Sequence, residues 1–176
     1  MVLGLTEVQI AVAVTAALGA SFVRGLAGFG MAILLVPVLS LAVPPAEAVV
    51  VSNWLGLLIG LVGLKRILGA SEKSALVIAA LAIVATPLGV WLLSLTDPAF
   101  ARLLIAMIAL AAFGLVLLPK KPAHYAPSAF ETGTTGFAAG TLTGFAGMPG
   151  LPIVPFYLRR EIAPELARAS MMTIFL

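Results

Sequence analysis

Cysteine is absent from the chain, and histidine occurs once among its 176 residues. The chain can therefore form neither a disulfide bond nor a thiolate metal site, and one histidine cannot build a histidine-rich metal cluster. Ser-His-Asp, His-Glu-x-x-His, phosphate-loop and paired-carboxylate arrangements are also missing from the sequence. We therefore expect no enzyme activity, no catalytic residue, no resident metal and no cofactor.

Charged residues are scarce as well, at 10% of the chain, whereas a soluble domain carries about 25%. Hydrophobic residues make up 62%, and the mean hydropathy is +1.19. This composition predicts an integral membrane protein whose surroundings are the lipid bilayer. The net charge is +3, but the basic residues lie as pairs in short loops and not along one stripe, so we expect no nucleic-acid partner.

Three apolar segments are long enough to cross a bilayer, which takes about 20 residues. They are residues 46–64, 74–95 and 100–118, each bordered by proline or charged residues. We predict an all-α, polytopic transmembrane helical bundle. The first twenty residues contain Glu7 and no basic residue, so we read residues 6–23 as a retained segment and not as a secretory signal.

Two further apolar segments, residues 6–43 and 129–158, are interrupted by glycine and proline. Each is too long for one plain helix, which favours a broken helix or a re-entrant hairpin. Non-helical backbone at membrane depth is tolerated only where it is buried in protein or lines a cavity, so the interruption must face the interior. We predict helix breaks at Pro37, Pro149, Pro152 and Pro155.

The two interrupted segments carry similar Gly-rich motifs about 119 residues apart, at 24–37 and 143–155. This spacing predicts an internal duplication, with a first repeat over residues 1–118, a cytoplasmic linker over 119–128 and an incomplete second repeat over 129–176. A partial helix starting at residue 164 would match the span that starts at 46. We expect either helices beyond residue 176 or a homo-oligomer to complete the second repeat.

Basic loops give an orientation, because cytoplasmic loops carry an excess of Lys and Arg. The loops around residues 65–73 and 120–121 lie two crossings apart, and therefore on one side, which we expect to be the cytoplasm of a bacterial-type inner membrane. If each interrupted segment is a hairpin, the repeats are inverted. If each crosses once, the repeats are parallel.

The motif glycines suggest a binding site. Glycine permits positive φ and close backbone approach, so a broken helix can present free N–H groups at the start of its second half, where the helix dipole favours an anion. Arg24 lies at the first break, and an ionisable residue inside a membrane suggests function. The predicted substrate-binding residues are Arg24, Gly25, Gly28, Phe29, Gly30, Asn53, Thr143, Gly144, Gly147 and Gly150.

Each of these assignments has a plainer alternative. The glycines could serve only close helix packing, as Gly136 and Gly140, four residues apart, would do. Arg24 could extend to a lipid headgroup or pair with Glu47. Asn53 could make an interhelical hydrogen bond.

The chain resembles the sulfite exporter TauE/SafE family of membrane permeases. The resemblance rests on Phe22-Val23-Arg24-Gly25-Leu26-Ala27-Gly28-Phe29-Gly30 running to Pro37, and on Gly136-x-x-x-Gly140-x-x-x-Gly144-x-x-Gly147 running through Gly150 to Pro155. It implies a duplicated bundle of about eight helices and transport of sulfite, sulfonates or related sulfur-containing or organic anions. At Gly28-Phe29-Gly30-Met31 the first motif has fewer glycines than is usual in the family.

These observations together predict a secondary carrier for a small anion that works by alternating access. A proton or cation gradient would drive it, because no ATP-binding motif exists. The alternative is a non-transporting membrane module or subunit whose Gly-rich motifs serve packing only.

Overall fold

The computed structural model of the protein describes residues 6–27, 30–62, 64–117 and 126–175. Every regular element in these ranges is a helix. The predicted all-α transmembrane bundle is thereby confirmed. The helices are α1 (Glu7–Ala27), α2 (Met31–Ala42), α3 (Pro45–Leu61), α4 (Leu64–Ala70), α5 (Lys73–Leu95), α6 (Pro98–Leu117), α7 (Ala129–Ala146), α8 (Gly150–Leu158) and α9 (Pro164–Ile174).

Three of the described helices are long and apolar enough to cross a membrane, namely α1, α5 and α6. Helices α5 and α6 correspond to the predicted spans 74–95 and 100–118. The predicted span 46–64 is shorter in the structure, because α3 ends at Leu61 and the chain starts the separate helix α4 at Leu64. Helix α9 begins at Pro164, where the partial helix was expected.

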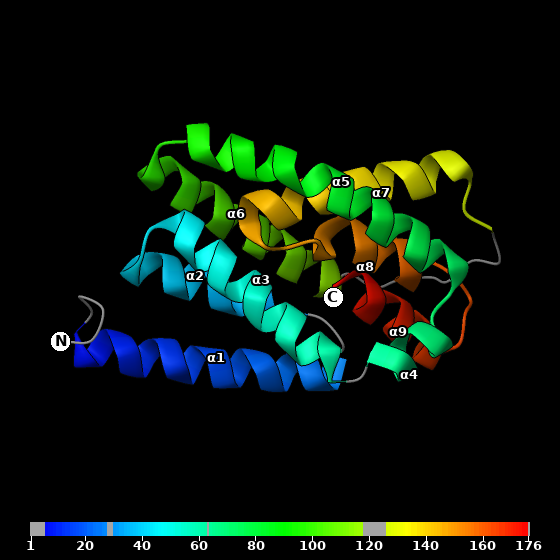
Figure 1. The fold of residues 1–176 in the computed structure, drawn as a ribbon, viewed down its shortest axis with the longest axis horizontal. Helices are drawn as coiled ribbons and strands as arrows, with labels where there is room; N and C mark the ends of the chain where they lie inside the picture. Colours follow the sequence, from blue (N-terminus) through cyan, green and yellow to red (C-terminus); the bar gives the residue numbers. More distant parts are fainter. Residues whose placement is uncertain (1–5, 28–29, 63, 118–125, 176) are drawn as a thin grey trace.

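The first interrupted segment forms a helical hairpin. Helix α2 begins directly after Gly30, whose φ of 97° is strained for any residue with a Cβ. Helices α1 and α2 pack against each other in opposite directions (Figure 1). Ala20 of α1 and Met31 and Leu35 of α2 form the buried contact between them.

The second interrupted segment repeats this arrangement with α7 and α8. Ser128 and Glu131 form a reciprocal capping box that starts α7. Gly147, with a φ of 68°, ends α7, and its N–H donates to the carbonyl of Thr143 at 2.9 Å. Helix α8 then starts after Pro149 and runs back along α7 (Figure 1).

The prolines break the helices less than predicted. Helix α2 continues through Pro37, and α8 continues through Pro152 and Pro155. Pro152 lies in the first turn, where an N–H has no helical acceptor, and the other two each remove one hydrogen bond from a helix held by its neighbours. Of the four predicted breaks, only Pro149 directly precedes a helix, and the predictions at Pro37, Pro152 and Pro155 are wrong. The chain turns at Gly30 in the first segment and at 147–149 in the second.

Helices α5 and α7 make the closest helix contact. A Cβ at Gly136, Gly140 or Gly144 of α7 would lie too close to the backbone of α5, at Ile78, Ala82 and Thr86 respectively, and the Cβ at Gly136 would also overlap Leu81. The contact advances by four residues on both helices together, so the two run in the same direction. Small residues at this spacing allow two membrane helices to approach closely.

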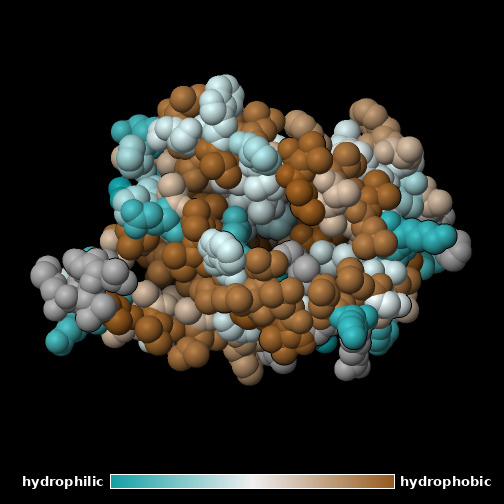
Figure 2. Space-filling model, viewed as in Figure 1, coloured by the Kyte–Doolittle hydropathy of each residue, from teal (hydrophilic) through white to brown (hydrophobic). Residues whose placement is uncertain are grey.

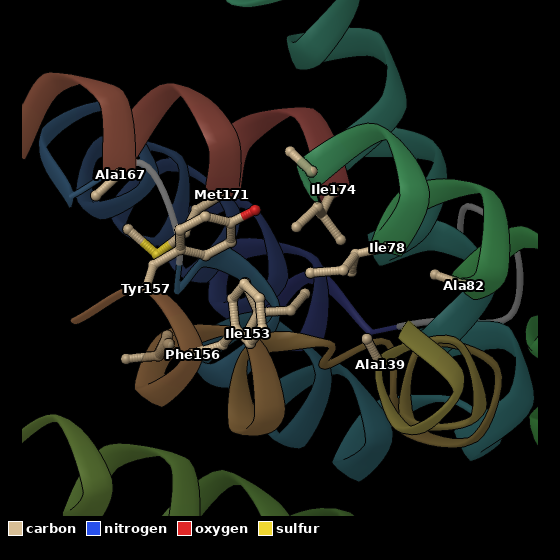
Figure 3. Packing of buried hydrophobic residues seen from close by; sticks show 11 residues of the cluster. Ile78, Ala82, Ala139, Ile153, Phe156, Tyr157, Ala167, Met171 and Ile174 are labelled. Atoms are coloured by element: carbon tan, nitrogen blue, oxygen red, sulfur yellow. The ribbon is translucent and has the colours of Figure 1, made fainter. Parts of the chain in front are cut away.

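Helices α8 and α9 pack into the core beside α5. In Figure 3, Ile153, Phe156 and Tyr157 of α8 face Met171 and Ile174 of α9. Tyr157 and Ile153 are fully buried in this cluster, together with Ile78 of α5. The end of α9 is therefore held against the centre of the bundle.

The outer surface is apolar over the long helices. Ile83 and Val84 of α5 are 74% and 77% exposed, and Leu110 of α6 is 71% exposed. Figure 2 shows a broad brown band of such side chains, with many of the hydrophilic residues toward the two ends of the molecule. An exposed apolar surface of this extent is typical of a protein surrounded by lipid.

Candidate functional site

The two Gly-rich motifs meet at one cavity of about 320 Å³. Six of the predicted binding residues line it, and they come from both Gly-rich motifs and from α3: Arg24, Gly30, Asn53, Thr143, Gly147 and Gly150. Further lining residues come from the start of α2, from α3 and from the end of α9. The structure thus brings together residues more than a hundred positions apart in sequence.

Arg24 provides the cavity's positive charge. Its side chain is 5% exposed, and its Nη2 donates to the carbonyls of Gly56 and Phe175, both at 3.1 Å. Its Nε is buried and has no acceptor among the described residues. An arginine has five N–H donors in a planar fork that suits an oxyanion, so two carbonyls orient the group and leave donors for a ligand.

Neither alternative for Arg24 holds. A side chain that reached a headgroup would be exposed, but Arg24 is buried. Glu47 is exposed at the start of α3, and within the described ranges no carboxylate pairs with Arg24. Arg24 is therefore a buried cation held by backbone carbonyls, an arrangement that favours a nearby anion.

Two helix N-termini border the same cavity. Gly30 and the first residues of α2 line one part, and Pro149 and Gly150 at the start of α8 line another. The first N–H groups of any helix lack an acceptor within the helix, and the dipole makes this end partly positive. The cavity thus combines two such ends with one guanidinium group.

Asn53 and Thr143 join α3 to α7 at the cavity wall. Asn53 Nδ2 donates to the Thr143 carbonyl at 3.4 Å, which is the interhelical bond considered as its alternative role. The Thr143 hydroxyl donates to the Ala139 carbonyl at 2.8 Å. The Thr143 hydroxyl is therefore already used, whereas the Asn53 carbonyl oxygen remains beside Gly147.

The remaining predicted residues lie elsewhere. Gly25 is exposed outside the cavity, and its carbonyl accepts a hydrogen bond from Arg168. Gly144 is buried against α5 and does not line the cavity. Neither glycine therefore lines the cavity, because spacing alone does not say which side of a helix a glycine occupies. Gly28 and Phe29 lie outside the described residues.

Two lining residues of α3 were missed by the sequence interpretation. Ser52 is 2% exposed, and its Oγ has no partner in the described part of the chain. Gly56, one turn later, has its Cα so close to Arg24 that an added Cβ would lie 3.1 Å from Nη1. The sequence signal for these two residues was their spacing, because Ser52 and Gly56 are small residues four positions apart and therefore share one face of the helix.

Away from the cavity, a polar cluster connects α5, α8 and α9. Arg160 donates to both oxygens of Glu72 at 2.6 Å, Ser74 also donates to Glu72, and Glu72 N–H donates to Ser170 Oγ. The hydrogen bonds from Arg160 lower the pKa of the Glu72 carboxyl, against the opposing effect of burial. Glu72 directly precedes α5, and both Glu72 and Arg160 lie outside the candidate membrane-crossing segment Lys73–Leu95.

A smaller cavity of about 140 Å³ lies on the other side of α8. Glu131, Thr134 and Arg159 are among its lining residues. The described residues contain no group of three or more acidic, histidine or cysteine side chains that could hold a metal.

Residues 13–176 match the protein family described as Sulfite exporter TauE/SafE. Comparisons with curated proteins and with solved structures give no match. The matched range covers most of the chain and contains every residue named above as lining the large cavity. This family comprises membrane transporters of sulfur-containing anions, and not enzymes. The chain therefore belongs to the sulfite exporter TauE/SafE family.

Proposed function

We propose that this chain is a secondary carrier that binds a small sulfur-containing or organic anion, such as sulfite or a sulfonate, in the large cavity. The observation that carries the proposal is the meeting of Arg24 with two helix N-termini in one cavity lined by both Gly-rich motifs. The guanidinium of Arg24 is oriented by two carbonyls, and the helix N-termini offer backbone N–H groups without helical acceptors. Together these positive charges and donors suit an oxyanion.

The size and lining of the cavity support a substrate with an organic part. About 320 Å³ is more than a bare oxyanion needs, and Met31, Ile33 and Leu57 add apolar surface beside the polar groups. A binding site of this kind has mostly apolar walls and a few polar groups that fix orientation. A sulfonate with a short organic group fits this description.

Alternating access is the proposed mechanism. Figure 1 shows α1 running from left to right and α7 from right to left, so the two hairpins point in opposite directions. Opposed hairpins favour the inverted repeats of many secondary transporters, in which one half moves against the other around a fixed site. A proton or cation gradient across the bacterial inner membrane would supply the energy.

The rival proposal is a membrane module whose glycines serve packing only. The tight contact of α7 with α5 favours that role for Gly136, Gly140 and Gly144. It does not account for Arg24, whose buried charge adds cost and no packing benefit. The two proposals therefore differ in what the cavity is for.

Uptake of labelled sulfite into proteoliposomes containing the full reading frame tests the carrier proposal. We expect saturable uptake that unlabelled sulfonates suppress, and loss of uptake in Arg24→Ala with unchanged yield of folded protein. Arg102→Ala is the control, because Arg102 also donates to a backbone carbonyl, that of Ser40, but does not line the cavity. Leak-level flux from folded wild-type protein for every anion tested would support the packing module.

A further inference from the structure

Ser52 differs from other hydroxyl residues that are buried or half-buried in these helices. Thr86, Thr143 and Thr173 each donate to the carbonyl four residues earlier, at 2.7 to 3.0 Å. This is the usual way for a helix to satisfy a buried hydroxyl. Ser52 lies in the middle of α3, is 2% exposed, and makes no such bond in the described part of the chain.

The position of Ser52 places it on the Arg24 side of α3. Ser52 and Gly56 are one helical turn apart and therefore share a face. Gly56 accepts the Arg24 hydrogen bond through its carbonyl, and both Ser52 and Arg24 line the large cavity. A buried polar group without a partner destabilises the fold, so this hydroxyl is unfavourable unless a ligand in the cavity accepts its hydrogen bond.

We propose that Ser52 donates a hydrogen bond to the transported anion, next to the free donors of Arg24. The inference rests on the proposed transport function and adds a residue to its site. Because both Nη2 hydrogens of Arg24 donate to backbone carbonyls, Nη1 can donate to one oxygen of an oxyanion, and the Ser52 hydroxyl can donate to another. The pair would therefore favour anions with several oxygen atoms on one centre, as in sulfite and sulfonates, over a monatomic anion.

Ser40 provides a matched control within the same chain. It is also 2% exposed, but its hydroxyl donates to the Pro37 carbonyl at 2.8 Å, and it does not line the cavity. Replacing either serine with alanine removes one oxygen from a buried helix. Only Ser52→Ala would remove a donor from the cavity.

The test is labelled sulfite uptake by proteoliposomes with wild-type protein, Ser52→Ala and Ser40→Ala, together with thermal unfolding of each variant. We expect Ser52→Ala to raise KM about tenfold or more, as for the loss of a hydrogen bond to a charged ligand, and Ser40→Ala to change KM less than about twofold. Ser52→Ala should also weaken inhibition by methanesulfonate more than inhibition by chloride.

Equal KM values for the two alanine variants would overturn the assignment of Ser52, while saturable wild-type uptake would leave the carrier proposal standing. A Ser52→Ala protein that unfolds at the wild-type temperature and has the wild-type KM would do the same. Absence of saturable uptake by folded wild-type protein would overturn the carrier proposal and this inference with it.

Discussion

At the scale of single residues, the site depends on how closely α3 approaches Arg24. The Gly56 carbonyl binds Nη2, and the Gly56 Cα leaves no free room beside Nη1. Glycine is needed here for space, because its backbone is helical. The orientation of the guanidinium thus depends on a neighbour that contributes no side chain.

Gly56→Ala should displace the guanidinium, because a Cβ there would lie 3.1 Å from Nη1. We expect the KM for sulfite to rise several-fold, since a guanidinium turned away from its ligand weakens a charge-assisted hydrogen bond. Gly114→Ala is the control, because a Cβ at Gly114 meets nothing within 4 Å. It should leave KM unchanged and stabilise α6 by about 0.5–1 kcal/mol. Equal KM values for Gly56→Ala and Gly114→Ala would contradict this prediction, because they would show that the Arg24 side chain accommodates the added Cβ without losing its contact with the ligand.

At the scale of elements, the contact between α5 and α7 holds the second hairpin in place. The glycines of α7 lie against backbone atoms of α5, so the contact has little tolerance for larger residues. The Glu72–Arg160 pair then connects the start of α5 to the end of α8. Both contacts position the N-terminus of α8 at the cavity.

Gly140→Ala should separate α5 from α7, because its Cβ would overlap the Ala82 backbone. We expect a loss of about 1–3 kcal/mol, as for other overpacking substitutions, read as a lower Tm in detergent. Gly133→Ala lies on the same helix with open space around it and should not lower the Tm. A Tm for Gly140→Ala as high as that of the control would contradict this packing.

Glu72 should make stability depend on pH. Its folded pKa is lowered, mainly by the Arg160 hydrogen bonds, so its contribution is complete above the unfolded pKa of about 4.3 and is lost as pH falls through the folded value. We expect the wild-type Tm to fall below about pH 4 for this reason. Thermal unfolding of Glu72→Gln should give a lower Tm at pH 7 and a weaker acid-dependent decrease. Identical dependence of Tm on pH for the wild type and Glu72→Gln would contradict a stabilising role for the Glu72–Arg160 pair.

At the scale of the whole molecule, the exposed apolar helices need a bilayer and the polar loops need water. Helix α5 is long and apolar enough to cross the bilayer, so we expect the loop near Ala70 and the loop near Ala99 to lie on opposite sides. The basic residues Lys65 and Lys73 flank the first loop and favour the cytoplasm for it. Lys120 and Lys121, the other basic loop used for this orientation, lie outside the described residues.

The absence of cysteine makes this orientation easy to measure. Ala70→Cys and Ala99→Cys each place one thiol at an exposed position of a cysteine-free chain. In intact cells a membrane-impermeant maleimide should label Ala99→Cys at once and Ala70→Cys only after the membrane is permeabilised. The reverse pattern would invert the topology, and equal labelling would mean that α5 does not cross.

The sequence by itself determined that this is a helical membrane protein, because hydropathy and length settle where apolar helices can be stable. It also placed an interruption within each Gly-rich motif, although the chain turns at Gly30 and Gly147 and not at Pro37, Pro152 or Pro155. Only the tertiary structure decided that the two motifs line one cavity, that Gly144 packs against α5, and that Ser52 lies beside the cavity. Those facts depend on the side of each helix that meets a neighbour, and glycine spacing fits packing and binding equally well.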